Sequence, residues 1–597
     1  MDDKILDWVL PAEKFSQDGD TQSMRTVARE IFELDKNSAE GLALMAEASF
    51  YQGDLQEAES FAQYALSVEP NHLRGRLVTG GVAIKNFKLK TQLNILDAVI
   101  NDAHKELKRL RANLQEHNRK FAFNRRKRTS EDEKFERRID KENFIVRSLL
   151  FKALCWSSNG LYLTGEPARA AESLLEASSL IYNDELAAEL YSKHLFLKNY
   201  RDLSQAQIKE LAQKYNSFFE NTTPFTHDKK SFNADKKIHV GYISPDFREH
   251  AVANFIPPLL QNYDAENFSV TCYFTGRKDS VTVKLKNFNV GWRDLIGKTP
   301  LLAANIIAED KVDILVDLSG HSQDSCLPIL AYKPAPVQIC GIGYISTTGL
   351  SAVDYFLSDK ICSPENLPTS FTEKILRVEP CSLCYSPGLI REMPAVDLRA
   401  PFLKNGFITY GSFNNFAKIH EELLYLWRAI LERVPNSKLI LKNKLCSLDE
   451  GKDIIKEKLS KMSFPLDRID LRPYSPDYLE QYREIDVALD TYPYTGGTTT
   501  CEALYMGVPV ITLRGKTHGA RFSASILNAA DISELIAQSP MDYINKAVQL
   551  SRRKELLSAY HVGLREHMQN SALMDSKNYI RELEKIYRAI WKNFCGK

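Results

Sequence analysis

The sequence of 597 residues predicts two consecutive α/β regions, each built on a parallel sheet, preceded by an all-α region of helical repeats. Length alone indicates several domains, because single hydrophobic cores stop growing near roughly 250–300 residues. A helix–turn–helix pattern dominates the early part of the chain, and short apolar strands alternate with helices from Lys236 onward. Such alternation, with polar residues at the carboxyl ends of strands, is typical of doubly wound sheets with a site at those ends.

Shifts in composition divide the chain into six expected segments. They are a helical-repeat region with a charged helical insertion, a linker, a first α/β lobe, an inter-lobe linker, a second α/β lobe and terminal helices. Their expected ranges are 1–200 (insertion 101–145), 201–235, 236–385, 386–405, 406–545 and 546–597. The inter-lobe linker contains Pro387, Pro394 and Pro401, and proline is poorly compatible with the interior of a helix or a sheet.

The bulk composition is that of a soluble globular protein, with 44% hydrophobic residues, 26% charged residues and a formal net charge of +1. This charge gives no indication of a nucleic-acid or membrane partner. The first residues lack the apolar core of a signal peptide, and no run approaches the ~20 apolar residues of a membrane span. Ten scattered cysteines suit a reducing compartment, so a cytoplasmic location is expected. Only Cys381 and Cys384 have metal-like spacing, and with no second pair nearby we do not expect zinc.

Residues 38–71 match a tetratricopeptide repeat. Small residues fall where its two helices must approach closely, a glycine falls at the turn and a proline at the closing position: Ala46, Ala58, Ala65, Gly53 and Pro70. A second unit at 151–181 keeps Gly165 at its turn but lacks the closing proline, and a weaker half-repeat precedes residue 38. Such units stack to bury their apolar faces. They either hold a polypeptide in a concave groove or form a packing cap for the rest of the chain.

The insertion at 101–145 is highly charged and contains a basic cluster followed by acidic residues. A run of this kind is usually a solvated helical face, and the alternative is a site for an acidic partner. The basic cluster consists of Arg119, Lys120, Arg125, Arg126, Lys127 and Arg128.

Apolar strands are predicted in the first lobe at 238–243, 312–318 and 337–342, and each is followed by polar residues. The second lobe repeats this pattern, with predicted strands at 407–410, 439–441, 487–489 and 508–513. Two doubly wound lobes facing one cleft form the architecture of a nucleotide-sugar glycosyltransferase of the GT-B type. The helical end of the chain, from about residue 542, is expected to pack back onto the first lobe.

The stretch 492–504 is the most informative in the chain, because a glycine-rich turn leads from a strand into a helical run expected from Cys501. Glycines let the backbone approach a ligand, and the N–H groups that begin a helix favour a phosphate or diphosphate. Glu502, in the first turn, is placed to reach a ribose hydroxyl. The alternative is a threonine-capped helix with no ligand.

Several long motifs, in the right order, resemble the catalytic region of the O-GlcNAc transferase and SPINDLY family. They are residues 333–338, 411–419 and 490–509, with 317–321 and 383–385 resembling the SPINDLY branch. The resemblance covers about 236 to 545, and tetratricopeptide repeats before such a region are the family's own arrangement. It implies an inverting, metal-independent transfer of a sugar from a nucleoside diphosphate to a Ser or Thr hydroxyl of a protein, with UDP-GlcNAc as the leading donor and no cofactor besides it.

The resemblance also implies roles for individual residues. Lys418 aligns with the family lysine at the donor diphosphate, where a fixed ammonium stabilises the charge of the departing phosphate. Thr498 and Thr499 align with diphosphate-binding threonines, Glu502 with a ribose-binding acid, and His250 with a histidine proposed as general base. Further donor-contact candidates are Gly497, Asn415, Lys374, Tyr478, His518 and Arg521, and candidates for sugar or acceptor contact are His321 and Thr348.

Three departures from the family pattern leave the nucleobase and the sugar open. Tyr478 stands about where the animal enzymes place a histidine beside the base, Gly497 replaces a further histidine, and Ile345 replaces a proline. O-fucosyl transfer from GDP-fucose and glucosyl transfer to asparagine therefore remain alternatives. Outside enzymes, the alternative is a non-catalytic scaffold, in which the repeats bind a partner and the lobes are a relic. For single residues, the alternatives are a surface lysine at a helix start for Lys418, and a helix cap or backbone contact for His250.

Overall fold

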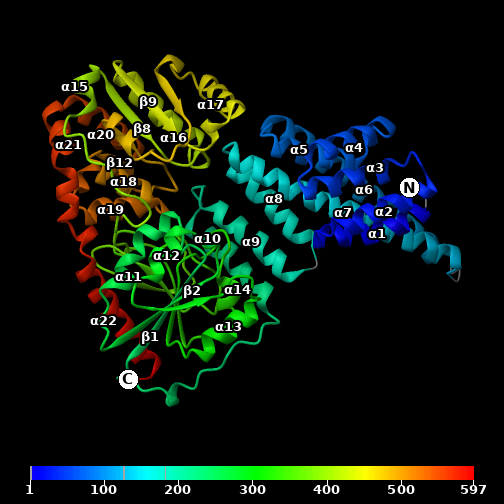
Figure 1. The fold of residues 1–597 in the computed structure, drawn as a ribbon, viewed down its shortest axis with the longest axis horizontal. Coiled ribbons are helices and arrows are strands. Elements are labelled where there is room, and N and C mark those ends of the chain that lie inside the picture. The colour runs from blue at the N-terminus through cyan, green and yellow to red at the C-terminus, as the bar shows by residue number, and fades with distance from the viewer. Residues whose placement is uncertain (1–2, 125–127, 182, 597) are drawn as a thin grey trace. The chain divides into compact units, whose positions relative to one another are not determined.

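The computed structural model describes residues 3–124, 128–181 and 183–596. The chain divides into two compact units, Met1–Leu190 and Tyr191–Lys597. The first unit is helical, and the second contains two parallel sheets with helices around them (Figure 1). The fold predicted from the sequence is therefore confirmed, with several corrections to the positions of its elements.

Helices of the first unit pack in consecutive pairs, as helical repeats require. The predicted repeat is the pair α3–α4, with Gly53 closing α3 at a φ of 87°, a left-handed conformation that glycine adopts without strain. The second predicted repeat joins the end of α7 to α8 through Gly165 at a φ of 84°. The helices are α1 (Asp3–Asp18), α2 (Thr21–Leu34), α3 (Ala39–Gln52), α4 (Leu55–Val68), α5 (Leu73–Lys85), α6 (Leu89–Asn124), α7 (Ser130–Leu163) and α8 (Pro167–Leu180), and α9 (Asp184–Lys198) crosses into the second unit.

The predicted charged insertion consists of the distal parts of α6 and α7, two long helices that pack against each other. In its basic cluster Lys120 pairs with Glu116 and Arg128 with Glu136, and three of these four side chains are largely exposed, Glu136 being the exception. Arg125, Arg126 and Lys127 lie outside the described residues. The described ion pairs favour a solvated helical face over a binding site.

The segment predicted as a linker at 201–235 is partly helical, which corrects the sequence-based expectation. Ser204 and Gln207 form a reciprocal cap at the start of α10 (Gln205–Gln213), and a 3₁₀ turn, Lys214–Phe219, follows. Gly349 approaches this segment so closely that a Cβ there would lie 2.0 Å from the Ala212 carbonyl oxygen. The segment is thus packed onto the first lobe.

The first lobe is a seven-stranded parallel sheet in the order β3-β2-β1-β4-β5-β6-β7. The predicted strands correspond to β1, β4 and β5. The strands β2 and β3, which lie between the first two in sequence, and β6 and β7 were not predicted. The alternating run from Phe268 to Phe274 was the available signal for β2. The strands are β1 (Ile238–Ser244), β2 (Phe268–Phe274), β3 (Gly291–Asp294), β4 (Ile314–Asp317), β5 (Val337–Cys340), β6 (Tyr355–Ser358) and β7 (Lys374–Arg377).

The second lobe is a six-stranded sheet in the order β10-β9-β8-β11-β12-β13, with every recorded strand pair parallel. All four predicted strands are present, as β8, β9, β11 and β12, and β10 and β13 extend the edges. The strands are β8 (Ile408–Ser412), β9 (Ser437–Lys442), β10 (Ile469–Arg472), β11 (Val487–Leu489), β12 (Val510–Leu513) and β13 (Ile536–Ala537).

Terminal helices begin at α20 (Pro540–Arg552), slightly before the predicted boundary, and continue through α21 (Lys554–Gln569). The last helix, α22 (Ser576–Phe594), contacts α11 (Pro257–Gln261) of the first lobe, as predicted (Figure 1). Trp591, fully buried, donates its indole N–H to the Asn233 carbonyl at 3.1 Å. Within the described ranges, no helix combines the length and apolar character that crossing a bilayer requires.

Candidate functional site

The loops that carry most candidate residues follow strands at the point where strand order reverses. In the first sheet β1 lies between β2 and β4, and His250 follows β1. In the second sheet β8 lies beside β11, Lys418 follows β8, and the glycine-rich turn follows β11. Ligands of open α/β sheets bind outside the carboxyl ends of strands at such reversals.

Asp490, directly after β11, holds the glycine-rich turn in place. Its Oδ1 accepts hydrogen bonds from the backbone N–H groups of Gly496 at 2.8 Å and Thr491 at 2.9 Å, and its Oδ2 accepts one from the Thr512 hydroxyl at 2.7 Å. The side chain is 2% exposed. These bonds fix the backbone that leads into the next helix.

That helix, α18 (Thr498–Tyr505), begins at Thr498, so the start expected at Cys501 was three residues late. Gly497 is its N-cap residue, and no side chain of the described residues makes a capping hydrogen bond there. The threonine hydroxyls bond elsewhere: Thr499 to Asn414 Oδ1 at 3.1 Å and Thr500 to Ser523 at 2.9 Å. The threonine-capped interpretation is therefore wrong, and the first N–H groups of α18 keep their capacity to bind an anion.

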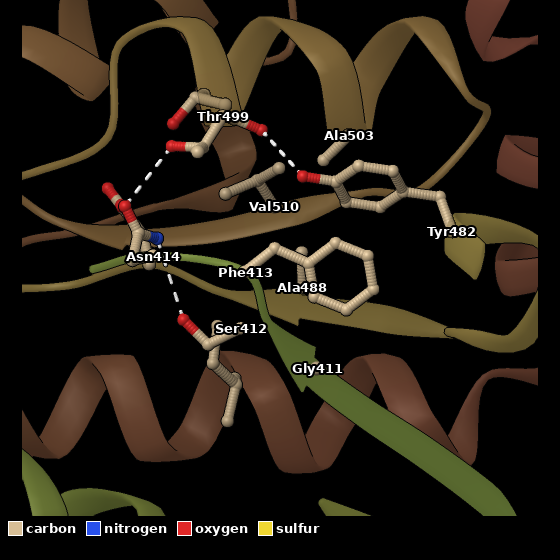
Figure 2. A pocket seen from close by; sticks show the side chains of 12 residues that line it. Gly411, Ser412, Phe413, Asn414, Tyr482, Ala488, Thr499, Ala503 and Val510 are labelled. Atoms are coloured by element: carbon tan, nitrogen blue, oxygen red, sulfur yellow. Dashed lines mark hydrogen bonds between the residues drawn. The ribbon is translucent and has the colours of Figure 1, made fainter. Parts of the chain in front are cut away.

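A cavity of about 10 Å³, room for one water molecule, lies beneath this helix start. Figure 2 shows Asn414 between Thr499 and Ser412, with the Tyr482 hydroxyl directed at the Thr499 carbonyl. Asn414 lies in the same loop as Lys418. The contact between Asn414 and Thr499 thus ties the Lys418 loop to the start of α18.

Lys418 ends a short 3₁₀ helix, Phe416–Lys418, and its amine turns toward the glycine-rich turn. Nζ donates to the Thr495 carbonyl at 3.1 Å and lies 3.7 Å from the centre of the Tyr494 ring. Burial lowers the pKa of Lys418 to about 8, although the Asp490 carboxyl opposes the shift. The amine therefore stays mostly protonated at neutral pH. Thr495, whose carbonyl accepts its hydrogen bond, lies three residues before the first residue of α18.

His250 lies in the loop after β1 and is half-buried. Its Nδ1 accepts a hydrogen bond from the Val252 N–H at 3.4 Å and lies 3.3 Å from Asp246 Oδ2. Burial, with a smaller contribution from the Arg248 charge, lowers the pKa of His250 to about 4. The ring is therefore neutral at physiological pH, with Nδ1 facing the Val252 N–H and the Asp246 carboxyl.

The two lobes meet beside His250. The Thr498 hydroxyl, at the start of α18, donates to the carbonyl of Ala251 at 3.0 Å. The structure thus brings Lys418, Thr498, Thr499 and His250 together around one helix start.

A second group lies one turn further along α18. The Tyr478 hydroxyl donates to Glu502 Oε1 at 2.5 Å, and the guanidinium of Arg391 lies 5.0 Å from the Tyr478 ring centre. Glu502 is 7% exposed, and burial raises the pKa of its carboxyl to about 7 despite the Tyr478 hydrogen bond. Tyr478 and Glu502, predicted separately, are direct partners.

His321 and Thr348, the candidates for sugar or acceptor contact, are held inside the first lobe. His321 is 1% exposed, with Nε2 donating to the Thr348 carbonyl at 2.7 Å and Nδ1 accepting from the Ser192 hydroxyl at 2.8 Å. The Thr348 hydroxyl is bonded to Glu373. Both ring nitrogens of His321 are therefore used within the protein, as in a satisfied core histidine.

Lys374 does not join the cluster. It is the first residue of the edge strand β7 and is exposed, so it lies at the amino end of a strand whose carboxyl end belongs to the site edge. Its proposed proximity to the sugar finds no support in this position.

The remaining candidates lie in different environments, some buried and one exposed. His518 is 4% exposed and packs against the Phe356 and Phe371 rings, while Arg521 donates to the Ile361 carbonyl at 2.5 Å and the Gly515 carbonyl at 3.1 Å. Burial lowers the pKa of His518 to about 4. Asn415, exposed, accepts from the Ala417 N–H at 3.0 Å and caps the 3₁₀ helix of Lys418. A Cβ on Gly497 would lie 3.0 Å from the Phe522 ring.

Asp490, Asn414 and Arg391 were not assigned roles from the sequence. Asp490 could have been found as a buried acid directly between a strand and a glycine turn, and Asn414 as a member of the Lys418 motif. Arg391 lies in a proline-containing linker and had no such signal. Its contacts are entirely tertiary.

An open groove of about 800 Å³ adjoins the His250 loop on the first lobe. Its wall at Gly276 packs so tightly on this loop that a Cβ there would lie 2.0 Å from the Pro245 carbonyl oxygen. The groove is lined by Thr275, Gly276, Arg277, Lys278, Asp294, Ile296, Lys298 and Asp324.

Among the described residues, no group of three or more His, Cys, Asp or Glu side chains is arranged to hold a metal ion. Cys381 and Cys384 are buried, and burial raises the pKa of both thiols.

Known proteins of similar sequence support the resemblance drawn from the motifs. A probable UDP-N-acetylglucosamine–peptide N-acetylglucosaminyltransferase SPINDLY from Solanum lycopersicum is 35% identical over 443 residues, covering 73% of this chain and 45% of the relative. The protein of the same name from Arabidopsis thaliana is 37% identical over 370 residues, covering 60% and 40%. The chain thus spans less than half the length of these curated relatives.

A solved structure and a family pattern extend the comparison to both lobes. A mutant O-GlcNAc transferase from Thermobaculum terrenum has a TM-score of 0.68 and 24% identity, over 100% of this chain and 99% of that one, which supports the GT-B fold. Residues 195–381 and 394–583 match glycosyl transferase family 41. Both lobes and much of the terminal helical region are included, and the chain belongs to glycosyl transferase family 41.

Proposed function

We propose that this chain transfers a sugar from a nucleoside diphosphate to a serine or threonine hydroxyl of a protein, with inversion and without a metal ion. UDP-N-acetylglucosamine is the leading donor, in keeping with the names of the relatives. The observation that carries the proposal is the position of the Lys418 amine, 3.1 Å from the Thr495 carbonyl and close to the uncapped start of α18.

The proposed roles of Lys418 and of the start of α18 follow from the charge that develops during sugar transfer. As the acceptor oxygen bonds to the anomeric carbon, the bond between that carbon and the phosphate oxygen breaks, and negative charge grows on the leaving diphosphate. The proton of the acceptor hydroxyl passes to solvent. A half-buried ammonium and the first N–H groups of α18 offer fixed positive charge and donors to that diphosphate, without the reorganisation that water would need. The Asp490 bonds and the Asn414–Thr499 contact hold both groups in place.

The His250 geometry supports a positioning role over that of a general base. Its Nδ1 faces the Val252 N–H and the Asp246 carboxyl, so Nε2 is the ring nitrogen left to contact a ligand. A pKa of about 4 also makes the ring a weak base, far below the working pH. We propose that His250 orients an oxygen of the sugar or of the acceptor.

The groove beside the His250 loop is the proposed path of the acceptor polypeptide on the first lobe. Arg277, Lys278 and Lys298 line it together with the apolar, 43% exposed Ile296. A polypeptide in this groove would bring a side-chain hydroxyl past His250.

The donor is tested by incubating the protein with labelled UDP-GlcNAc, UDP-glucose and GDP-fucose in the presence of a cell lysate. GDP-fucose is included because Tyr478 leaves the nucleobase open. We expect one donor to label protein in the presence of EDTA, and to raise the unfolding free energy by about 2.7 kcal/mol at 100 times its Kd. No labelling and no stabilisation by any of the three would contradict the proposal and favour a non-catalytic scaffold.

Lys418→Ala tests the charge-stabilising step. We expect kcat to fall by about 10²-fold or more, because a preorganised positive group at a developing charge is lost. Lys458→Ala is the matched control, since its amine lies 5.5 Å from the Phe416 ring beside the same segment. Turnover that is equal in the Lys418 and Lys458 variants would remove Lys418 from the mechanism.

A further inference from the structure

Arg391, in the linker between the lobes, contacts both of them at once. Its Nη2 donates to Glu249 Oε1 of the first lobe at 2.6 Å, and its Nη1 donates to the Pro476 carbonyl of the second lobe at 2.9 Å. Its guanidinium also lies over the Tyr478 ring, at 5.0 Å from the centre. The Arg391 side chain is 26% exposed and that of Glu249 is 56% exposed, so water screens the ion pair in part.

These contacts connect the two ends of the candidate site. On one side, Tyr478 donates to Glu502, the residue expected at the ribose. On the other, Glu249 directly precedes His250 in the chain. A continuous path of contacts therefore runs from Glu502 through Tyr478 and Arg391 to the His250 loop.

The His250 loop is held on both sides of the histidine. Before it, the Glu249 side chain bonds to Arg391, and the Glu249 N–H bonds to Asp279 at 2.6 Å. After it, the Ala251 carbonyl accepts from Thr498 at the start of α18. His250 thus lies between a contact to the linker and a contact to the proposed diphosphate site.

We propose that Arg391 is a positioning residue that aligns the His250 loop with the nucleoside end of the donor site. This role rests on the proposed glycosyl transfer. A base and ribose bound at Tyr478 and Glu502 order the Tyr478 ring, the ordered ring fixes the guanidinium, and the guanidinium fixes Glu249 beside His250. Donor binding then sets the histidine in place for the acceptor.

Four variants separate this role from simple anchoring of the linker. Arg391→Ala removes every contact, Arg391→Lys keeps a charge without the planar fork, and Glu249→Gln removes only the ion pair. Arg483→Ala is the matched control, because Arg483 donates to the Ala395 carbonyl at 2.9 and 2.7 Å in the same linker. Its recorded contacts include neither Glu249 nor Tyr478.

The kinetic readout is kcat against donor KM for transfer. We expect kcat to fall about tenfold in Arg391→Ala, the size of one lost charge-assisted hydrogen bond, with donor KM rising less than about threefold. Glu249→Gln should reproduce most of the kcat loss, a double variant that combines Arg391→Ala with Glu249→Gln should add little to it, and Arg391→Lys should recover part of it. Arg483→Ala should leave kcat within about twofold of the wild type.

A second readout, hydrogen exchange of the backbone amides at 250–256 without ligand, does not depend on activity. We expect faster exchange in Arg391→Ala and Glu249→Gln but not in Arg483→Ala. Unchanged exchange in the first two variants overturns the proposal, and so does faster exchange with unchanged kcat. If the wild type turns over no nucleotide sugar, the proposed function fails, while the exchange comparison still determines whether Arg391 holds the loop.

Discussion

At the scale of single residues, the protonation of the buried Glu502 carboxyl makes the candidate site sensitive to pH. Burial is the largest influence on its pKa, which lies near 7 instead of the ordinary 4.5, and the Tyr478 hydroxyl reduces the shift. Above about pH 7 the ionised carboxylate can accept hydrogen bonds from Tyr478 and from a ribose hydroxyl together. Glu502, which is expected to bind the donor, is thus costly to ionise in the folded protein when no donor is bound.

Glu502→Gln should remove a pH dependence of stability. Between about pH 4.5 and 7 the folded protein keeps a proton on Glu502 that the unfolded chain has lost, so the free energy of unfolding falls as pH rises. The loss is at most about 3 kcal/mol and is complete above pH 7. Urea unfolding of the wild type and Glu502→Gln at pH 5 and pH 8 measures it as a change in their difference. A constant difference would show that the Glu502 carboxyl is not shifted.

Residues near one another in sequence motifs were predictable, while residues joined only by folding were not. Lys418, Thr498 and Thr499 belong to loops that follow adjacent strands, so strand topology brings them together. His321 also follows a strand, but the α9 and α10 region covers it, through Ser192 and the edge of the Tyr215 ring. Sequence pattern alone did not distinguish a covered strand end from an open one.

At the scale of elements, four helices of the first unit meet at one buried cluster of charges around Arg74. Arg74 of α5 is fully buried and bonds to Glu13 of α1 and to Glu40 and Glu47 of α3. Lys152 of α7 also bonds to Glu47, at 2.6 Å. Burial opposes ionisation of Glu47, but the Lys152 and Arg74 charges outweigh it and hold its pKa at about 2.

Arg74→Met should destabilise the first unit by about 3–5 kcal/mol, because it leaves buried carboxylates without their main partner. Arg76→Met, two residues along the same helix, is the control. Arg76 pairs with the 36% exposed side chain of Asp102, a pair worth about 1 kcal/mol or less. Hydrogen exchange of peptides from α3 and α5 across a urea series measures both. Equal effects of the two substitutions would contradict a special role for the buried cluster.

Elements with strong periodicity or turn chemistry were predicted best. The α3–α4 repeat has glycine where its turn is left-handed, whereas β2 was missed although apolar and polar residues alternate along it. The start of α18 was placed late because threonine is a weak helix former, and tertiary bonds of the Thr499 and Thr500 hydroxyls overcome that preference. The segment 201–235, expected to be a linker, contains the capped helix α10, which its composition did not indicate.

At the scale of the whole second unit, the chain passes between its lobes more than once. The linker leads from the first sheet to the second, and after the second sheet α22 returns to the first. The Tyr587 and Tyr242 hydroxyls lie 3.4 Å apart, and Arg588 donates to the Lys236 carbonyl at 2.7 Å. The last helix therefore completes the core of the first lobe, although it follows the second lobe in sequence.

Trp591→Ala should loosen the first lobe while leaving the second intact. Trp591 is fully buried against the first lobe, and truncating a buried tryptophan costs about 3–5 kcal/mol. Phe594→Ala is the control, because Phe594 stacks on Trp591 at 5.6 Å but is only half-buried, so its removal should cost less. We expect amides of β1 to exchange faster in Trp591→Ala, with those of β8 unchanged and UDP or GDP binding preserved. Equal loss of protection in β1 and β8 would mean that the lobes unfold as one cooperative unit and that α22 does not stabilise the first lobe selectively.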